Sequence, residues 1–173
     1  VDSLGNFIQN LDLDSTYLDY VDCSTFEVDS SNYSDITCNG FNDGNASILT
    51  MQNGSGNYLY NWNNGDTTNE ISNINSGNYY CIVTDVNWQQ CSDSIGFLIS
   101  EPAQLIATTS LSMISCFGGS DGEITVGVSG GLLPYAFTLN GVQNTNPFPL
   151  DSVFTVLSEG VYHISVVDDN GCQ

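Results

Sequence analysis

The sequence predicts an all-β chain made of tandem immunoglobulin-like β-sandwich repeats that are stapled by disulfides. Three observations lead to this fold class: side chains alternate in short runs, one pattern recurs with a period of about 80 residues, and the chain contains six cysteines. No segment shows the 3.6-residue periodicity of an amphipathic helix. Short strands that alternate with turns in a unit of this size are typical of a small two-sheet sandwich.

Alternation places the individual strands. Every second side chain is expected on one face in five segments, at residues 48–50, 58–62, 79–83, 135–139 and 162–166. Asparagine or aspartate followed by glycine, a pair that tolerates positive φ angles, marks turns at residues 43–44, 64–65, 121–122, 140–141 and 170–171. Tyr79, two residues before Cys81, resembles the tyrosine corner of immunoglobulin domains.

The internal repeat sets the expected domain boundaries. The segment CNGFNDGNASI from Cys38 returns as CFGGSDGEITV from Cys116, and the two copies close in Cys91 and Cys172. We therefore expect three parts: the C-terminal part of a preceding repeat plus a linker, a complete repeat and a second repeat, at residues 1–35, 36–105 and 106–173.

The chain has no C-x-x-C pair of the kind found in zinc sites, so we expect its cysteines to form disulfides. Disulfides imply an oxidising, extracellular setting. The second copy contains only Cys116 and Cys172, so a bridge inside that copy joins these two. The internal match then pairs Cys38 with Cys91. Each such loop, of roughly 54 residues, would remove about 4 kcal/mol of chain entropy from the unfolded state.

Two cysteines are left over in this scheme. Cys81 aligns with Ile164, a core-facing position, and is either a buried thiol or one half of an immunoglobulin-type bridge. Cys23 ends a tail at residues 8–23 that resembles the ends of the two copies, and it pairs most simply with a cysteine upstream of the chain. A Cys23–Cys81 bridge is the alternative.

The charge of the chain excludes several functions. It has 20 acidic residues, one histidine and neither lysine nor arginine, which gives a formal net charge of −20. Nucleic-acid binding and a polybasic membrane anchor both depend on lysine and arginine, so neither is expected. No apolar stretch is long enough for a membrane span, and we expect no membrane insertion.

Three motifs together carry a family likeness. C-x-G-x-x-D-G-x-I, Y-x-W-x-x-G and G-x-Y-x-(I/V)-x-V-x-D with a closing cysteine make the chain similar to the SprB-type repeat. The resemblance implies a structural repeat of a large bacterial cell-surface adhesin or filament, exported by type IX secretion and supporting adhesion or gliding motility. It also implies neighbouring repeats of the same chain as partners, with surface polysaccharide and lateral self-assembly as further candidates.

Acidic loops are the candidates for a metal site, since calcium is bound by six to eight oxygens. The candidate ligands within the repeats are Asp43, Asp121, Asp168 and Asp169. Further candidates are Asp12, Asp14, Asp19, Asp22 and Asn170. The expected outcome is that these residues form solvated turns and that the chain has no cofactor, with calcium binding as the alternative.

Glycans enter the analysis in two ways. Trp88 and Phe117 are the candidate aromatic platforms of a glycan-binding, calcium-dependent recognition domain, which is the alternative function; interdomain packing is the competing role. O-glycosylation in bacteria with such repeats resembles Asp-Ser or Asp-Thr followed by an apolar residue or threonine. The sites in that context are Ser3, Ser15, Thr67, Ser94 and Ser152.

Catalysis is not expected. A Ser-His-Asp or Cys-His arrangement would need His163, the single histidine, and its position in the alternation turns it outward on a strand. The chain is therefore expected not to be an enzyme.

Overall fold

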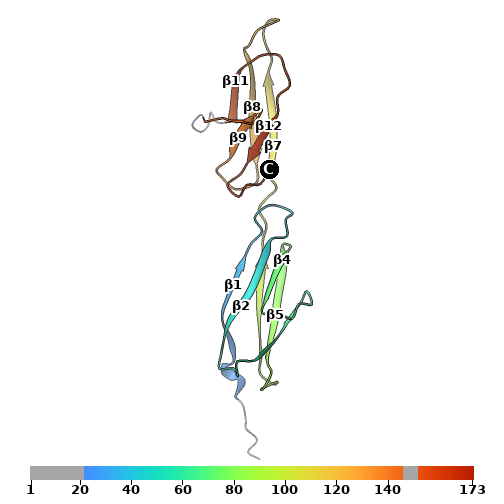
Figure 1. Cartoon of the computed structure of the whole chain (residues 1–173), viewed down its shortest axis with the longest axis vertical. Coiled ribbons are helices and arrows are strands. Elements are labelled where there is room, and N and C mark those ends of the chain that lie inside the picture. Colours follow the sequence, from blue (N-terminus) through green and yellow to red (C-terminus); the bar gives the residue numbers. More distant parts are fainter. Residues whose placement is uncertain (1–21, 146–151) are drawn as a thin grey trace, which may run out of the picture.

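The computed structural model describes residues 22–145 and 152–173. Two β-sandwiches lie end to end along the long axis of the molecule (Figure 1). The first contains η1 (Cys23–Thr25), β1 (Glu27–Ser34), β2 (Gly44–Gln52), β3 (Tyr58–Trp62), β4 (Glu70–Ile74), β5 (Gly77–Asp85) and β6 (Ser92–Ile99). The second contains β7 (Ile106–Ser112), β8 (Gly122–Ser129), β9 (Ala136–Leu139), β10 (Val142–Gln143), β11 (Val153–Leu157) and β12 (Ile164–Val167). The predicted all-β class is confirmed.

The first sandwich pairs a sheet of order β1-β2-β4 with a sheet of order β3-β5-β6, and all strand pairs are antiparallel. Alternation explains the layers: Ala46 and Ile48 on β2 and Cys81 and Val83 on β5 are at most 1% exposed, while their neighbours face outward. Trp62 on β3 completes this core and donates its indole N–H to the carbonyl of Thr68 (2.8 Å).

The second sandwich repeats the plan with sheets of order β11-β8-β7 and β10-β9-β12. Its core is smaller and is formed by Ile124, Val126, Phe137, Phe154 and Val166. In the described part of the chain β12 pairs only with β9, so it lies at a sheet edge, whereas its counterpart β5 is flanked by β3 and β6.

The first domain boundary differs from the expectation. Residues 27–34, expected in a linker, form β1 and pair along β2 from Glu27↔Gln52 to Ser34↔Asn45. The strand EVDSSNYS has hardly any apolar side chains and contributes no fully buried residue, because it is an edge strand. Its alternation is therefore too weak to identify it from the sequence.

The tyrosine corner occurs in both sandwiches. Tyr79 donates its hydroxyl to the carbonyl of Asn75 (3.1 Å), and Tyr162 donates to the carbonyl of Ser158 (2.8 Å). Each bond reaches four residues back along the chain, so each ties the loop before a strand to that strand.

Replacing either corner tyrosine with phenylalanine is expected to lower the free energy of unfolding of its own sandwich by about 1 kcal/mol, the usual net contribution of one hydrogen bond. Urea unfolding of Tyr79→Phe and Tyr162→Phe measures this. Tyr80→Phe is the control because Tyr80 is 51% exposed. An equal loss in the control would contradict a specific role for the corner bond.

Candidate functional site

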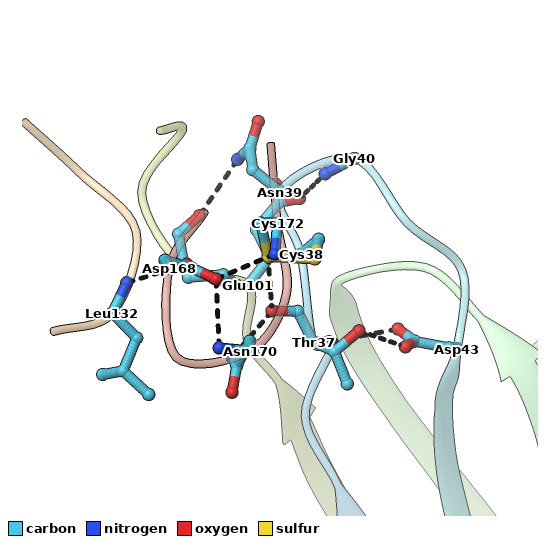
Figure 2. Close-up of a disulfide and its surroundings, with 11 residues drawn as sticks. Thr37, Cys38, Asn39, Gly40, Asp43, Glu101, Leu132, Asp168, Asn170 and Cys172 are labelled. Atoms are coloured by element: carbon cyan, nitrogen blue, oxygen red, sulfur yellow. Dashed lines mark hydrogen bonds between the residues drawn. A yellow bond between two sulfur atoms is a disulfide. The ribbon is translucent and has the colours of Figure 1, made fainter. Parts of the chain in front are cut away.

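The candidate site is the junction between the two sandwiches, where polar groups of both sandwiches and of the linker are hydrogen-bonded to one another (Figure 2). Three segments meet there: the start loop of the first sandwich (residues 37–43), the linker (residues 100–105) and the closing loop of the second sandwich (residues 168–172). The second sandwich has its own start loop at residues 115–121, and the first has its own closing loop at residues 85–91.

The start loop is shaped by its aspartate. Asp43 accepts hydrogen bonds from the backbone N–H of Thr37 (3.1 Å) and from its hydroxyl, which closes the loop around Cys38. Gly40 has a φ of 78°, a conformation that side chains disfavour. The amide of Phe41 donates to the carbonyl of Cys38 (3.0 Å) and completes the turn.

The closing loop is organised by a buried carboxylate. Asp168, 5% exposed, accepts from the backbone N–H groups of Leu132 (2.9 Å), Asn170 (3.0 Å) and Cys172 (2.8 Å). Its own N–H donates to the carbonyl of Cys172 (3.1 Å). These bonds position Cys172 at the end of the second sandwich that faces the first.

A disulfide joins the two loops across the junction. Cys38 and Cys172 are bonded, with their Cα atoms 5.6 Å apart. Beside this bridge, Asn170 donates its side-chain amide to the carbonyl of Thr37 (2.8 Å). The two sandwiches are therefore connected by a covalent bond between residues 134 positions apart, in addition to the linker.

The linker is held from both sides. Asn39 donates its side-chain amide to the carbonyl of Pro102 (3.1 Å), and the N–H of Gly40 donates to the carboxylate of Glu101 (2.7 Å). On the other side Gly131 donates to the carbonyl of Ala103 (2.8 Å). A Cβ on Gly130 would lie 1.9 Å from the carbonyl oxygen of Gln104, so the chain segments touch there without space for a side chain.

The other end of the first sandwich has a related arrangement. Asp85, fully buried, accepts from the backbone and hydroxyl of Ser55 (2.6 and 2.7 Å) and from the N–H groups of Asn87 (2.8 Å) and Trp88 (2.9 Å). It aligns with Asp168 and likewise supports a closing cysteine, Cys91. Cys91 bonds to Cys23, which lies just before β1.

The disulfide pairing expected from the internal match, Cys38–Cys91 and Cys116–Cys172, is wrong. In the first sandwich Cys38 lies near the Gly77 end of β5, and the closing loop with Cys91 follows the Asp85 end. A nine-residue strand separates these ends by about 27 Å. Disulfide formation requires Cα atoms within about 7 Å, so start and closing cysteines of one sandwich cannot meet.

The second sandwich shows the same separation. Cys116 precedes the start of β8, and Cys172 packs beyond its other end, so Cys116 is exposed and unbonded while Cys172 reaches Cys38. Cys81 is buried and unbonded, which agrees with a buried thiol rather than an immunoglobulin-type bridge. Burial raises the pKa of the Cys81 thiol.

The two buried carboxylates are held in the ionised state. Burial raises the pKa of Asp85, but the hydrogen bonds from Ser55, Trp88 and Asn87 outweigh it, so the pKa lies below its ordinary value. The pKa of Asp168 is lowered in the same way: burial raises it, and backbone N–H groups led by that of Leu132 lower it further than burial raises it.

We expect acid to destabilise the chain through these groups. A carboxyl group whose pKa is lower in the folded than in the unfolded state stabilises the fold fully at pH values above its unfolded pKa of about 3.9. This stabilisation is lost as the pH falls from there through the folded pKa. Thermal unfolding followed from pH 7 to pH 3 at one salt concentration should show a drop below about pH 4. The drop should be shallower in Asp85→Asn and in Asp168→Asn than in the unaltered chain. Equal slopes in all three chains would contradict this assignment.

The predicted metal ligands are not brought together. Asp43 accepts from Thr37, its counterpart Asp121 accepts from the N–H of Ser115 (3.1 Å), and Asp168 is occupied by backbone donors. Within residues 22–145 and 152–173 no three His, Cys, Asp or Glu side chains form a group that could hold a metal ion. Calcium stays a prediction, and Asp12, Asp14 and Asp19 lie outside the described residues.

The remaining predicted sites are dispersed. Trp88 is half-buried in the closing loop of the first sandwich, and Phe117 is fully exposed in the start loop of the second. Of the glycosylation candidates, Thr67 and Ser94 are exposed and Ser152 is half-buried, whereas Ser3 and Ser15 lie outside the described residues. His163 is exposed, as expected. None of the helices in the described part of the chain is long and apolar enough to cross a membrane.

Sequence comparison identifies the repeat. The family model described as "SprB repeat" matches the chain twice, over residues 30–67 and 108–144. Each match begins inside the first strand of a sandwich, β1 or β7, and continues through the start loop to a point beyond the third strand, β3 or β9. The resemblance predicted from the motifs is thereby confirmed. A search of curated proteins finds no match to the chain.

Proposed function

Because this chain carries two SprB repeats, which are repeat modules of cell-surface proteins, we propose that it is a stalk segment of a bacterial surface adhesin or filament. The observation that carries the proposal is the covalent junction: sandwiches that lie end to end are tied by the linker and by Cys38–Cys172. Such a segment holds an adhesive part of its parent protein away from the cell, in support of adhesion or gliding motility.

The strand order supports an immunoglobulin-like stalk domain. In chain order, strands one, two and four form one sheet and strands three, five and six form the other, as the A-B-E and C-F-G strands do in immunoglobulin folds. Domains of this type have their ends at opposite poles, which suits stacking in a row.

The charge supports an extended array. A net charge of −20 without lysine or arginine gives neighbouring copies like-signed surfaces, and these repel over roughly 8 Å at physiological ionic strength. Export by type IX secretion and O-glycosylation belong to the same proposal through the family resemblance. The proposal assigns no catalytic activity and no cofactor to the chain.

A glycan panel tests the stalk function against the recognition function. The oxidised chain is applied to bacterial polysaccharides and cell-surface glycans, with calcium and then with a chelator. A stalk segment binds none of them in either condition. Saturable binding that is lost on chelation or in Trp88→Ala would instead make the chain a recognition domain; Tyr80→Ala is the matched control for removal of an exposed aromatic ring.

Solution scattering tests the extended arrangement directly. The oxidised chain is expected to be a rod whose longest dimension is the same at low and at high salt, because the junction is fixed by covalent and hydrogen bonds rather than by repulsion. A compact, folded-back particle at high salt would contradict the stalk proposal.

A further inference from the structure

The second start loop has the same structure as the loop that forms the inter-sandwich bridge. Asp121 accepts from the N–H of Ser115 as Asp43 does from that of Thr37, and Gly118 has a φ of 77°. The amide of Gly119 donates to the carbonyl of Cys116 (2.9 Å), the same bond that closes the turn around Cys38. The sequence therefore builds one cysteine-presenting loop twice, and only the first has its partner.

The surface around Cys116 is apolar and open. Cys116 is exposed and unbonded, and Phe117, Met113 and Leu111 are 103%, 87% and 68% exposed. In the first sandwich the corresponding cysteine, Cys38, is covered and is only 6% exposed. Ile36 is 3% exposed and donates its N–H to the carbonyl of Ser100 at the start of the linker (2.9 Å), and Glu101 and Pro102 of that linker contact the start loop.

We propose that the Cys116 end of the second sandwich receives a further repeat of the same kind, and that Cys116 forms a disulfide with the closing cysteine of that repeat. The partner is specified by the junction already seen, where the closing cysteine of one sandwich meets the start cysteine of the sandwich before it. Phe117, which stands where Asn39 touches the linker, packs against the incoming linker. The inference rests on the proposed tandem array.

The bond forms by ordinary thiol oxidation. The thiols of Cys116 and of the closing cysteine lose two protons and two electrons, and a disulfide oxidant accepts them and becomes two thiols. Disulfide oxidants of this class act outside the cytosol, where surface proteins fold.

An extended chain tests the proposal. After Cys172, residues 92–173 are appended a second time, which supplies a copy of β6, the linker and a further second sandwich with its own closing cysteine. The chain is folded with oxidised glutathione, and its disulfides are mapped by mass spectrometry after non-reducing digestion with chymotrypsin. The expected map joins Cys116 to the appended closing cysteine, keeps Cys38–Cys172 and leaves Cys81 and the appended Cys116 as thiols.

Two readouts decide the outcome. Native alkylation should modify Cys116 in the 173-residue chain but not in the extended chain, and Cys116→Ala should expose one reactive thiol at the appended closing cysteine. Alkylation of Cys116 in an extended chain that has formed Cys38–Cys172 would overturn the proposal, as would a Cys116 bond between two chains. A chain that forms neither bridge would refute the junction itself. Glycan binding, which would refute the stalk function, leaves this disulfide map unaffected.

Discussion

Replacing both Cys38 and Cys172 with alanine is expected to lower the free energy of unfolding of the second sandwich by about 4 kcal/mol. While the first sandwich is folded, Ile36 and Ser100 hold the linker beside the Cys38 loop, so the bridge closes a loop of roughly 70 residues around the second sandwich. Without the bridge this unfolded segment regains its chain entropy.

The first sandwich should change by less than about 1 kcal/mol in the same variant. The second sandwich has the smaller core and an edge at β12, so it unfolds first. When the first sandwich then unfolds, the loop closed by the bridge becomes longer. The entropy of loop closure rises only slowly with loop length, so the bridge adds little to the stability of the first sandwich.

Guanidinium unfolding can separate the two responses. Trp62 and Trp88 both lie in the first sandwich, so tryptophan fluorescence reports that sandwich alone, while far-ultraviolet circular dichroism reports both. The expected result is a dichroism transition at lower denaturant with an almost unchanged fluorescence transition. Cys116→Ala, which removes an exposed free thiol, is the control. Equal shifts of both signals would mean that the junction unfolds as one cooperative unit.

Asp85→Ala is expected to lower the free energy of unfolding of the first sandwich by roughly 3 kcal/mol or more. The change leaves four donors, from Ser55, Asn87 and Trp88, without their acceptor in a part-buried site. Each unsatisfied buried donor costs about 1–3 kcal/mol, and water that enters reduces this cost. Fluorescence-detected unfolding measures the loss.

Asp168→Ala is the matched variant in the second sandwich, where three backbone donors lose their acceptor. It should move the dichroism transition and spare the fluorescence transition. Asp169→Ala removes an exposed carboxylate at the neighbouring position and should have little effect. If Asp169→Ala destabilised the second sandwich as much as Asp168→Ala does, the loss could not be assigned to the hydrogen bonds of Asp168. The prediction would then be wrong.

Local patterns allowed several of the strands and the bond of the tyrosine corner to be predicted. Alternation identifies β3 and β5 because both have one face in the core, and it fails for β1, whose polar side chains lie at a sheet edge. Asp85 was missed as a site residue although it aligns with Asp168, which was considered only as a metal ligand. The internal match carries that signal: an aspartate at the end of the same strand in both copies.

The disulfide pairing could not be obtained from the repeat pattern alone. Matching Cys38 with Cys116 and Cys91 with Cys172 identifies equivalent positions. It does not show that the start and closing cysteines of one sandwich lie at its opposite poles. That follows from strand length and direction, and it turns the closing cysteine toward the sandwich before it. Cys172 therefore bonds to Cys38 across the junction and Cys91 bonds to Cys23 just before its own sandwich, instead of the pairings expected within one copy.

The Cys38–Cys172 bridge also changes what a single cut in the polypeptide can do. The boundary between the sandwiches is crossed by two independent covalent connections, the backbone of the linker and the pair of sulfur atoms. A protease that hydrolyses one peptide bond anywhere between residues 38 and 172 leaves both new ends on one molecule. Even a second cut in that span releases at most the piece between the two cuts, and separating the chain before Cys38 from the chain after Cys172 also requires a reductant. Damage to one loop therefore need not shorten the proposed stalk.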